Sequence, residues 1–198
     1  MKGIPLTIPN IITLFRIIII PVFVLAFILP GYPYKHIILV SLFFLAGISD
    51  WFDGFLARRL KQQSAFGAFL DPVADKLMVT TAMILLVMSP PGLESPSLLI
   101  VFPAIVIIGR EIAISALREW MAKVGAQTKV KVSFIGKVKT ASQLLAIGFL
   151  LYDQPIGSFQ PTLVGYVLLY MATILTLWSM IVYLRASWSS LVENDRAE

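Results

Sequence analysis

Long apolar stretches, separated by prolines, glycines and charged residues, are the feature that most constrains this chain. Of its 198 residues 58% are hydrophobic and only 14% are charged, and the mean hydropathy is +0.87. A helix that crosses a bilayer needs about 20 mostly apolar residues. Six stretches fit this requirement, at residues 11–29, 36–60, 66–88, 98–121, 137–152 and 163–184. The sequence therefore predicts an all-α integral membrane protein with six transmembrane helices, forming a single membrane domain over residues 1–198.

Lysine and arginine fall almost entirely on one side of these spans. The connections after the first, third and fifth spans contain a single basic residue, Lys35, whereas those after the second and fourth are rich in them. By the positive-inside rule the basic side is cytoplasmic, which also puts both termini in the cytoplasm. Because the net charge of +5 sits beside apolar spans, anionic lipids or phosphorylated substrates are expected as partners rather than nucleic acid.

Four aspartates stand in one window where a lipid environment makes each of them costly, and they are Asp50, Asp53, Asp71 and Asp75. An acid at the centre of a membrane helix costs roughly 2.5 to 3.5 kcal/mol. At helical spacing each pair lies on one stripe with small residues; the first stripe continues through Gly54, Ala57 and Arg58, and the second begins at Gly67. A tight turn near residues 61–64 makes the two helices antiparallel neighbours. The stripes can then face each other across one cavity near the cytoplasmic side.

Oxygen-only clusters of this kind suit hard divalent cations, Mg²⁺ or Mn²⁺, and two such ions would offset the four negative charges. Gly54, Ala57 and Gly67 leave the backbone bare, so a phosphorylated ligand can approach closely. Two simpler interpretations stay open: the acids could merely pair with nearby basic residues, and the small residues could serve only close helix packing. The sole histidine, His36, lies at the other end of its span, which disfavours a Glu/His di-iron bundle. The absence of cysteine excludes a disulfide framework and a thiolate site.

The window reads D-x₂-D-G-x₂-A-R-x₈-G-x₃-D-x₃-D and resembles the signature of the CDP-alcohol phosphatidyltransferases at every defined position. Members of that family transfer the phosphatidyl group of a CDP-linked lipid to an alcohol and release CMP. The number of spans and the chain length also fit, so the resemblance covers essentially the whole chain. It implies that Asp50, Asp53 and Asp71 bind the metal ions. It also implies that Asp75 is the catalytic base and touches the metal site.

The same resemblance implies a binding site for the CDP-lipid. Gly54, Arg58 and Ser64 align with positions that hold this substrate, and Ala57 and Gly67 border it. Near the start of the chain, "IPNIITLFR" resembles the N-terminal segment of the family, where Thr13 and Arg16 would lie against the nucleotide.

Basic residues outside the signature are the candidates for recognising the acceptor alcohol. Arg110 and Arg118 are eight positions apart, on one helical face, and Lys137 and Lys139 stand at the entry of the fifth span. Together they could hold a dianionic phosphate. Positive-inside topology alone could also explain such residues, and Glu111 could simply neutralise Arg110.

Both segments resemble the bacterial branch of the family that uses sn-glycerol 3-phosphate as acceptor and forms phosphatidylglycerophosphate. This implies a protein of the bacterial cytoplasmic (inner) membrane, and the family also implies a homodimer. Serine, inositol phosphate or phosphatidylglycerol remain alternative acceptors. A small cation transporter is a further alternative, although such sites lie near the midplane of the membrane, often within inverted repeats, and no repeat is visible here.

Overall fold

The computed structural model describes residues 7–60, 65–123 and 134–195. These residues form six helices, α1 (Ile8–Ile28), α2 (Lys35–Leu60), α3 (Ala65–Met88), α4 (Leu98–Lys123), α5 (Phe134–Tyr152) and α6 (Pro161–Asp195). Each helix corresponds to one predicted span, and most ends differ by only a few residues. Helix α6 is the exception, because it continues through the polar C-terminal segment as far as Asp195. The predicted all-α fold is confirmed.

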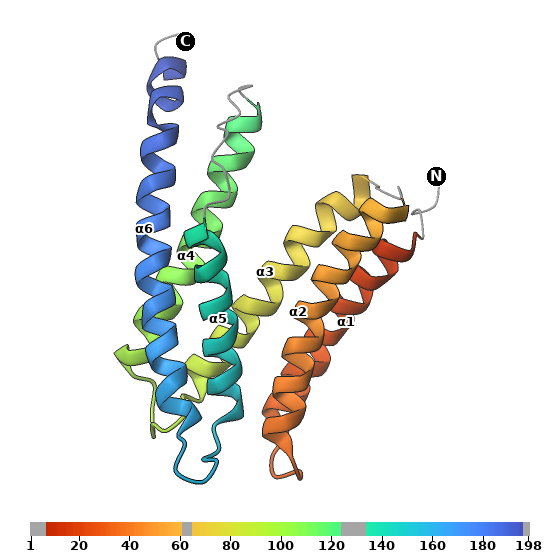
Figure 1. Cartoon of the computed structure of the whole chain (residues 1–198), viewed down its shortest axis with the longest axis vertical. Helices are drawn as coiled ribbons and strands as arrows, with labels where there is room; N and C mark the ends of the chain where they lie inside the picture. The colour runs from red at the N-terminus through yellow and green to blue at the C-terminus, as the bar shows by residue number, and fades with distance from the viewer. Residues whose placement is uncertain (1–6, 61–64, 124–133, 196–198) are drawn as a thin grey trace.

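The six helices form two groups, which are joined by α3 and by a direct contact between α2 and α5. Helices α1 and α2 lie side by side, α4, α5 and α6 form the second group, and α3 crosses obliquely between them (Figure 1). Helix α3 contacts α1, α2, α4 and α5. The first turn of α1, the end of α2, the start of α3 and the end of α6 all lie at the same end of the molecule (Figure 1). This agrees with the predicted alternation of the spans, in which both termini face the same side.

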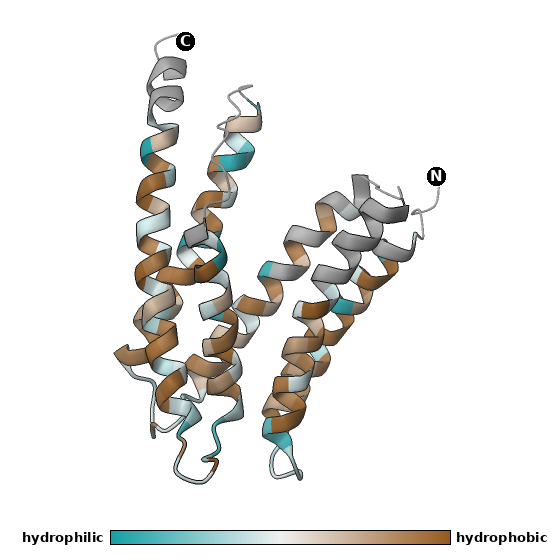
Figure 2. Ribbon diagram, viewed as in Figure 1, coloured by the Kyte–Doolittle hydropathy of each residue, from teal (hydrophilic) through white to brown (hydrophobic). Residues whose placement is uncertain are grey.

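The surface of the helices is apolar, as expected for contact with lipid. Among the described residues, three segments are long and apolar enough to cross a membrane by themselves: Asn10–Ile28, Leu98–Lys123 and Pro161–Trp188. Within the described residues, helices α2 and α3 carry shorter apolar parts, Lys35–Ser49 and Lys76–Met88. Hydrophobic residues are spread along the helices in Figure 2, and many large apolar side chains are exposed, among them Leu25, Ile105 and Ile174. Such extensive exposed apolar surface is typical of a membrane protein.

Small residues allow the closest helix contacts. At Gly165 of α6, an added Cβ would lie 2.8 Å from Cγ of Leu150 and 3.2 Å from its backbone nitrogen on α5. Lipid removes the hydrophobic driving force between helices, so their association in a membrane depends on close packing of this kind. Gly165 therefore brings α5 and α6 together into one unit.

Lys35, the single basic residue on its side of the spans, has a local structural role. Its ammonium donates to the carbonyl oxygens of Phe27 at 2.5 Å and Leu29 at 2.9 Å. The Tyr32 hydroxyl donates to the carbonyl oxygen of Ala26 at 2.7 Å. A cation at a helix C-terminus satisfies free carbonyls and interacts favourably with the helix dipole. Lys35 thus closes the end of α1 where the chain turns into α2.

The connection between α5 and α6 is held by Asp153. This residue adopts a φ of 40°, a left-handed conformation that aspartate tolerates better than most residues. Its carboxylate accepts a hydrogen bond of 2.8 Å from Thr162 at the start of α6. Burial raises the pKa of Asp153 above its ordinary value, and the hydrogen bond from Thr162 opposes that rise.

Candidate active site

The helices that carry the four aspartates meet at the end of the molecule where α2 ends and α3 begins. Asp50 and Asp53 belong to the second half of α2, and Asp71 and Asp75 to the first half of α3. The two helices contact each other and converge toward this end (Figure 1). The aspartate side chains lie outside the described residues, as do the side chains of Ala57 and Arg58, the surroundings of Gly54 and the whole of Ser64. The four aspartates lie within helices, as predicted, and the facing of the two stripes stays a prediction.

Gly67, by contrast, is described. It lies in the first turn of α3 and is buried. Further along the same helix Ala74 is fully buried, directly before Asp75. Small buried residues therefore line α3 beside the aspartates, in agreement with a close approach of another backbone or of a ligand.

Helix α1 contributes a polar stripe to the same end of the molecule. Asn10, Thr13 and Arg16 repeat every three residues and are at most 1% exposed. Thr7 caps the helix one turn earlier, where its side-chain oxygen accepts from the backbone N–H of Asn10 at 3.5 Å. Burying a guanidinium is costly unless polar partners surround it. An arginine buried in an otherwise apolar span therefore indicates a polar site between α1, α2 and α3.

Asn10 was not among the site residues predicted from the sequence. The signal that could have found it is the three-residue spacing to Thr13 and Arg16.

A second polar region opens between α3, α4 and α5. It is a cavity of about 330 Å³, called the basic pocket below, and its polar and charged lining residues are Lys76, Thr80, Arg110, Glu111, Arg118, Lys139, Thr140 and Gln143. Three of the four predicted acceptor-binding residues, Arg110, Arg118 and Lys139, line it. Lys137 does not line it and is exposed, because residues two apart on a helix point about 200° apart.

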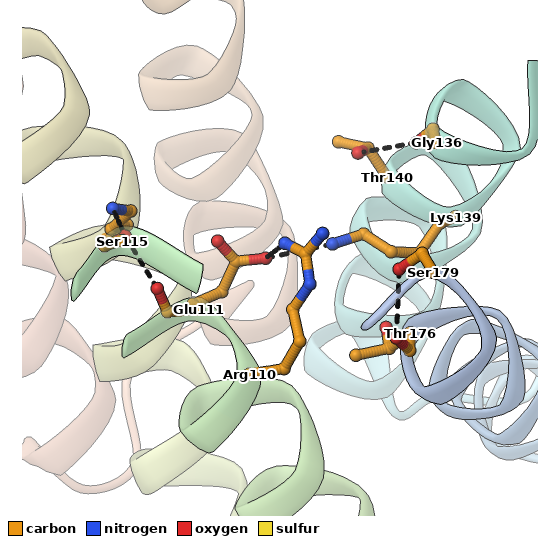
Figure 3. A network of polar contacts seen from close by, with 9 residues as sticks. Arg110, Glu111, Ser115, Gly136, Lys139, Thr140, Thr176 and Ser179 are labelled. Carbon is orange, nitrogen blue, oxygen red and sulfur yellow. Dashed lines mark hydrogen bonds and ion pairs between the residues drawn. The ribbon is translucent and has the colours of Figure 1, made fainter. Parts of the chain in front are cut away.

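The centre of the basic pocket is an ion-pair cluster. The Glu111 carboxylate accepts from Nη1 of Arg110 at 2.7 Å and from Nζ of Lys139 at 2.9 Å, through the same oxygen, Oε1. Arg110 and Glu111 come from α4 and Lys139 from α5, and the three charged groups meet in Figure 3. The side chains of Arg110, Lys139 and Glu111 are only 14%, 7% and 27% exposed. Glu111 does neutralise Arg110, and it also pairs with a second cation, which no sequence spacing indicated.

Lys76 connects this pocket to the aspartate helix. It directly follows Asp75 in α3, and its ammonium hydrogen-bonds the Ser115 hydroxyl of α4. The Ser115 hydroxyl in turn donates to the carbonyl oxygen of Glu111 at 2.7 Å. The signal for Lys76 was its position beside the fourth aspartate. Only the crossing of α3 over α4 shows that it reaches the basic pocket.

Arg118 lies eight residues beyond Arg110 on α4. Its guanidinium carbon is 5.4 Å from the centre of the Tyr183 ring on α6, within the range of a cation–π interaction. The ring holds the guanidinium at the edge of the basic pocket. Tyr183 is a second residue that sequence reasoning missed, because nothing along the chain relates it to Arg118.

A larger cavity, of about 490 Å³, lies at the opposite end of the molecule. It is lined in part by Lys35, His36, Tyr152 and Asp153, and the rings of His36 and Tyr152 stack edge to face at 5.0 Å. His36 is therefore far along α2 from the aspartates, as predicted. This cavity contains none of the predicted site residues.

Within the described side chains no three histidine, aspartate or glutamate residues gather into a metal-binding group. The four aspartates are outside that set. Their donor chemistry fits the predicted ions, since carboxylate oxygens from two adjoining helices are the ligands that Mg²⁺ and Mn²⁺ prefer.

Comparison with known sequences gives matches over most of the chain. The sequence model of the CDP-alcohol phosphatidyltransferase family matches residues 6–178. A protein of Haemophilus influenzae named CDP-diacylglycerol–glycerol-3-phosphate 3-phosphatidyltransferase is 49% identical over 187 residues, which cover 94% of this chain and 96% of the relative. A protein of Pseudomonas fluorescens with the same name is 48% identical, covering 98% and 96%. A third, from Yersinia pestis, is 49% identical, covering 95% and 98%.

Proposed function

Because the chain belongs to the CDP-alcohol phosphatidyltransferase family, we propose that it transfers the phosphatidyl group of CDP-diacylglycerol to sn-glycerol 3-phosphate. The products are phosphatidylglycerophosphate and CMP. The names of the relatives, which are about half identical over nearly their whole length, support this choice of substrates. The observation that carries it is the basic pocket, where Arg110 and Lys139 are mostly buried beside the helix that bears Asp71 and Asp75.

Asp50, Asp53, Asp71 and Asp75 would hold Mg²⁺ or Mn²⁺, and two ions would balance their charge. Divalent ions at such a site neutralise the pyrophosphate and stabilise the departing phosphate. The remaining candidates bind the CDP-lipid. Thr13 and Arg16 lie against the nucleotide, and the buried polar stripe of α1 supports this role. Gly54, Ala57, Arg58, Ser64 and Gly67 border the pyrophosphate, where small residues allow close approach.

The reaction is a displacement at the phosphorus atom of the phosphatidyl group. A hydroxyl of glycerol 3-phosphate attacks this phosphorus, the new P–O bond forms, and the bond to the oxygen of CMP breaks. Asp75 accepts the hydroxyl proton as the new bond forms, which raises the nucleophilicity of the oxygen. Arg110, Arg118 and Lys139 hold the phosphate of the acceptor and so orient its free hydroxyl toward the aspartate helices. Lys137, which is exposed in the first turn of α5, attracts the anionic acceptor over a longer range.

The reaction belongs at the cytoplasmic face of the bacterial inner membrane, where both termini also lie. The positions of the helix ends in Figure 1 support a common side for the termini and the aspartate window. The protein acts as a homodimer in this proposal, as the family resemblance implies.

Turnover of purified protein tests the proposal directly. The protein is incubated with CDP-diacylglycerol and Mg²⁺, and CMP is measured with glycerol 3-phosphate, serine, inositol phosphate or phosphatidylglycerol as acceptor. We expect CMP and phosphatidylglycerophosphate with glycerol 3-phosphate, loss of turnover on chelation, and recovery on adding Mg²⁺ or Mn²⁺. Faster turnover with another acceptor would reassign the substrate, and undiminished turnover after exhaustive chelation would refute the metal site.

A further inference from the structure

Glu111 is the only anion among the described residues that line the basic pocket. A pocket that binds a phosphate would bind it more tightly without a carboxylate at its centre, because like charges repel. The position of this acid therefore needs a physical reason.

Glu111 forms ion pairs with Arg110 and Lys139, the same two cations that would bind the acceptor phosphate. Its Oε1 accepts from both Arg110 and Lys139, at 2.7 and 2.9 Å. The other two cations of the pocket have different partners, since Lys76 donates to Ser115 and Arg118 stacks on Tyr183. Glu111 thus competes for Arg110 and Lys139 and not for the whole pocket.

Burial makes this competition strong. Arg110 and Lys139 have side chains that are 14% and 7% exposed, so water provides little alternative solvation for either cation. The Nε of Arg110 is buried and, among the described residues, makes no hydrogen bond. A phosphate that enters can take this donor and replace the Glu111 oxygen at Nη1. A ligand with only neutral hydroxyl groups cannot replace the Glu111 carboxylate in this way, because its hydrogen bonds to Arg110 and Lys139 would be weaker than ion pairs.

We propose that Glu111 is an internal competitor for the acceptor phosphate, an affinity-setting residue that occupies Arg110 and Lys139 whenever the basic pocket is empty. The inference rests on the proposed function of the same pocket. The phosphate of glycerol 3-phosphate displaces the Glu111 carboxylate on binding. The product retains that phosphate, so the return of Glu111 to the two cations helps the product leave. Glu111 thereby weakens binding of the acceptor and also speeds release of the product.

Competition of this kind has a quantitative signature. It lowers the affinity of every anion that needs Arg110 and Lys139 by one common factor, because each must displace the same ion pairs. Replacing Glu111 by glutamine keeps the shape of the side chain and removes its charge. Glu111→Gln is therefore expected to lower KM for glycerol 3-phosphate about tenfold. The same variant is expected to lower the dissociation constant of inorganic phosphate by a similar factor.

The control variant is Glu119→Gln. Glu119 lies on the same helix and pairs with Lys123 at 3.0 Å, but both side chains are at least 70% exposed and neither lines the basic pocket. This variant is expected to leave both constants within about twofold of the parent value, as an exposed ion pair contributes little.

Two measurements separate the inference from the proposed function. Thermal stabilisation by inorganic phosphate reports binding without CDP-lipid or turnover. KM for glycerol 3-phosphate reports the acceptor in the reaction. A parent protein without CMP release refutes the proposed function, whereas a parent that turns over normally while Glu111→Gln shows an unchanged or raised KM refutes the inference. Structural damage does not lower KM and strengthen phosphate binding together.

Glu111→Gln leaves two mostly buried cations without a carboxylate, which can impair folding. A double variant, Glu111→Gln with Lys139→Gln, removes one charge of each sign and is compared with Lys139→Gln alone. Tighter phosphate binding by the double variant supports the inference, because Arg110 is then released from Glu111. Equal or weaker binding refutes it.

Discussion

At the scale of single residues, the properties of the basic pocket depend on which charged side chains form ion pairs inside it and which point to solvent. Arg110 and Lys139 share the Oε1 of Glu111, whereas Lys137, only two positions from Lys139, is exposed. Because Lys139 is buried and Lys137 is exposed, a hydrogen bond to Lys139 contributes more binding free energy than one to Lys137. A hydrogen bond to a charged group contributes about 1.5–3 kcal/mol when it is protected from water, and an exposed lysine contributes far less.

Arg110→Ala tests this difference. Loss of a charged donor to the acceptor phosphate is expected to raise KM for glycerol 3-phosphate at least about tenfold, with KM for CDP-diacylglycerol little changed. Steady-state kinetics in detergent micelles measure both constants. Lys137→Ala is the control and is expected to change the acceptor KM less than about threefold. Equal effects of the two substitutions would contradict the assignment of the pocket.

Tyr183 is the other residue-scale test, since it touches the acceptor site only through Arg118. A cation–π contact contributes about 0.5–1 kcal/mol at a partly exposed site. Tyr183→Leu is therefore expected to raise the acceptor KM about two- to fivefold. Tyr183→Phe retains the ring and is expected to match the parent. If both variants behave alike, the ring does not position Arg118.

At the scale of helices, close approach decides which elements form a unit. Helices α5 and α6 meet where Gly165 leaves room for Leu150, and Thr162 and Asp153 fasten the connection between them. Helix α5 carries Lys139 and α6 carries Tyr183, so the packing of this pair also positions two residues at the basic pocket.

Gly165→Ala should loosen that pair. The added Cβ would lie 2.8 Å from the Leu150 side chain and 3.2 Å from its backbone nitrogen, so the helices must separate. Overpacking of this kind typically costs about 1–3 kcal/mol, and the thermal unfolding temperature in detergent is expected to fall. Gly109→Ala is the matched control, because nothing lies within 4 Å of its Cβ position. It is expected to leave the unfolding temperature unchanged or raise it, since alanine favours a helix.

At the scale of the whole molecule, the oblique path of α3 makes one site from separate parts. It crosses between the two groups of helices and contacts α1, α2, α4 and α5 (Figure 1), and its Lys76 and Thr80 line the basic pocket. Asp75 and Lys76 are consecutive on this helix, and Lys76 already reaches Ser115 of α4. An acceptor held in the basic pocket would therefore lie next to the helix segment of the aspartates that we propose as metal ligands.

The orientation in the membrane is a further prediction at this scale. The chain contains no cysteine, so a single introduced cysteine can be labelled without background. Ser95 is exposed between α3 and α4, and Lys123 is exposed at the end of α4. A membrane-impermeant maleimide is expected to label Ser95→Cys in intact spheroplasts and Lys123→Cys only after the spheroplasts are lysed. The reverse pattern would invert the proposed topology.

The sequence alone determined the helices that the structure describes, whereas the sidedness of the spans and the metal chemistry of the aspartate window stay predictions. Apolar length and the spacing of acids along a helix are local properties, and lipid forces every backbone group of a span into its own helix. Thr13 and Arg16 of α1 were predicted from the resemblance of the N-terminal segment to the family, and their role beside the nucleotide stays a prediction. The structure adds that both side chains are buried.

Only the tertiary structure decided which charges share a pocket. Lys139 meets Glu111 across α4 and α5, Lys76 meets Ser115 across α3 and α4, and Tyr183 meets Arg118 across α4 and α6. These pairings depend on the angles at which packed helices cross, which follow from the fit of side chains between helices and leave no period in the sequence.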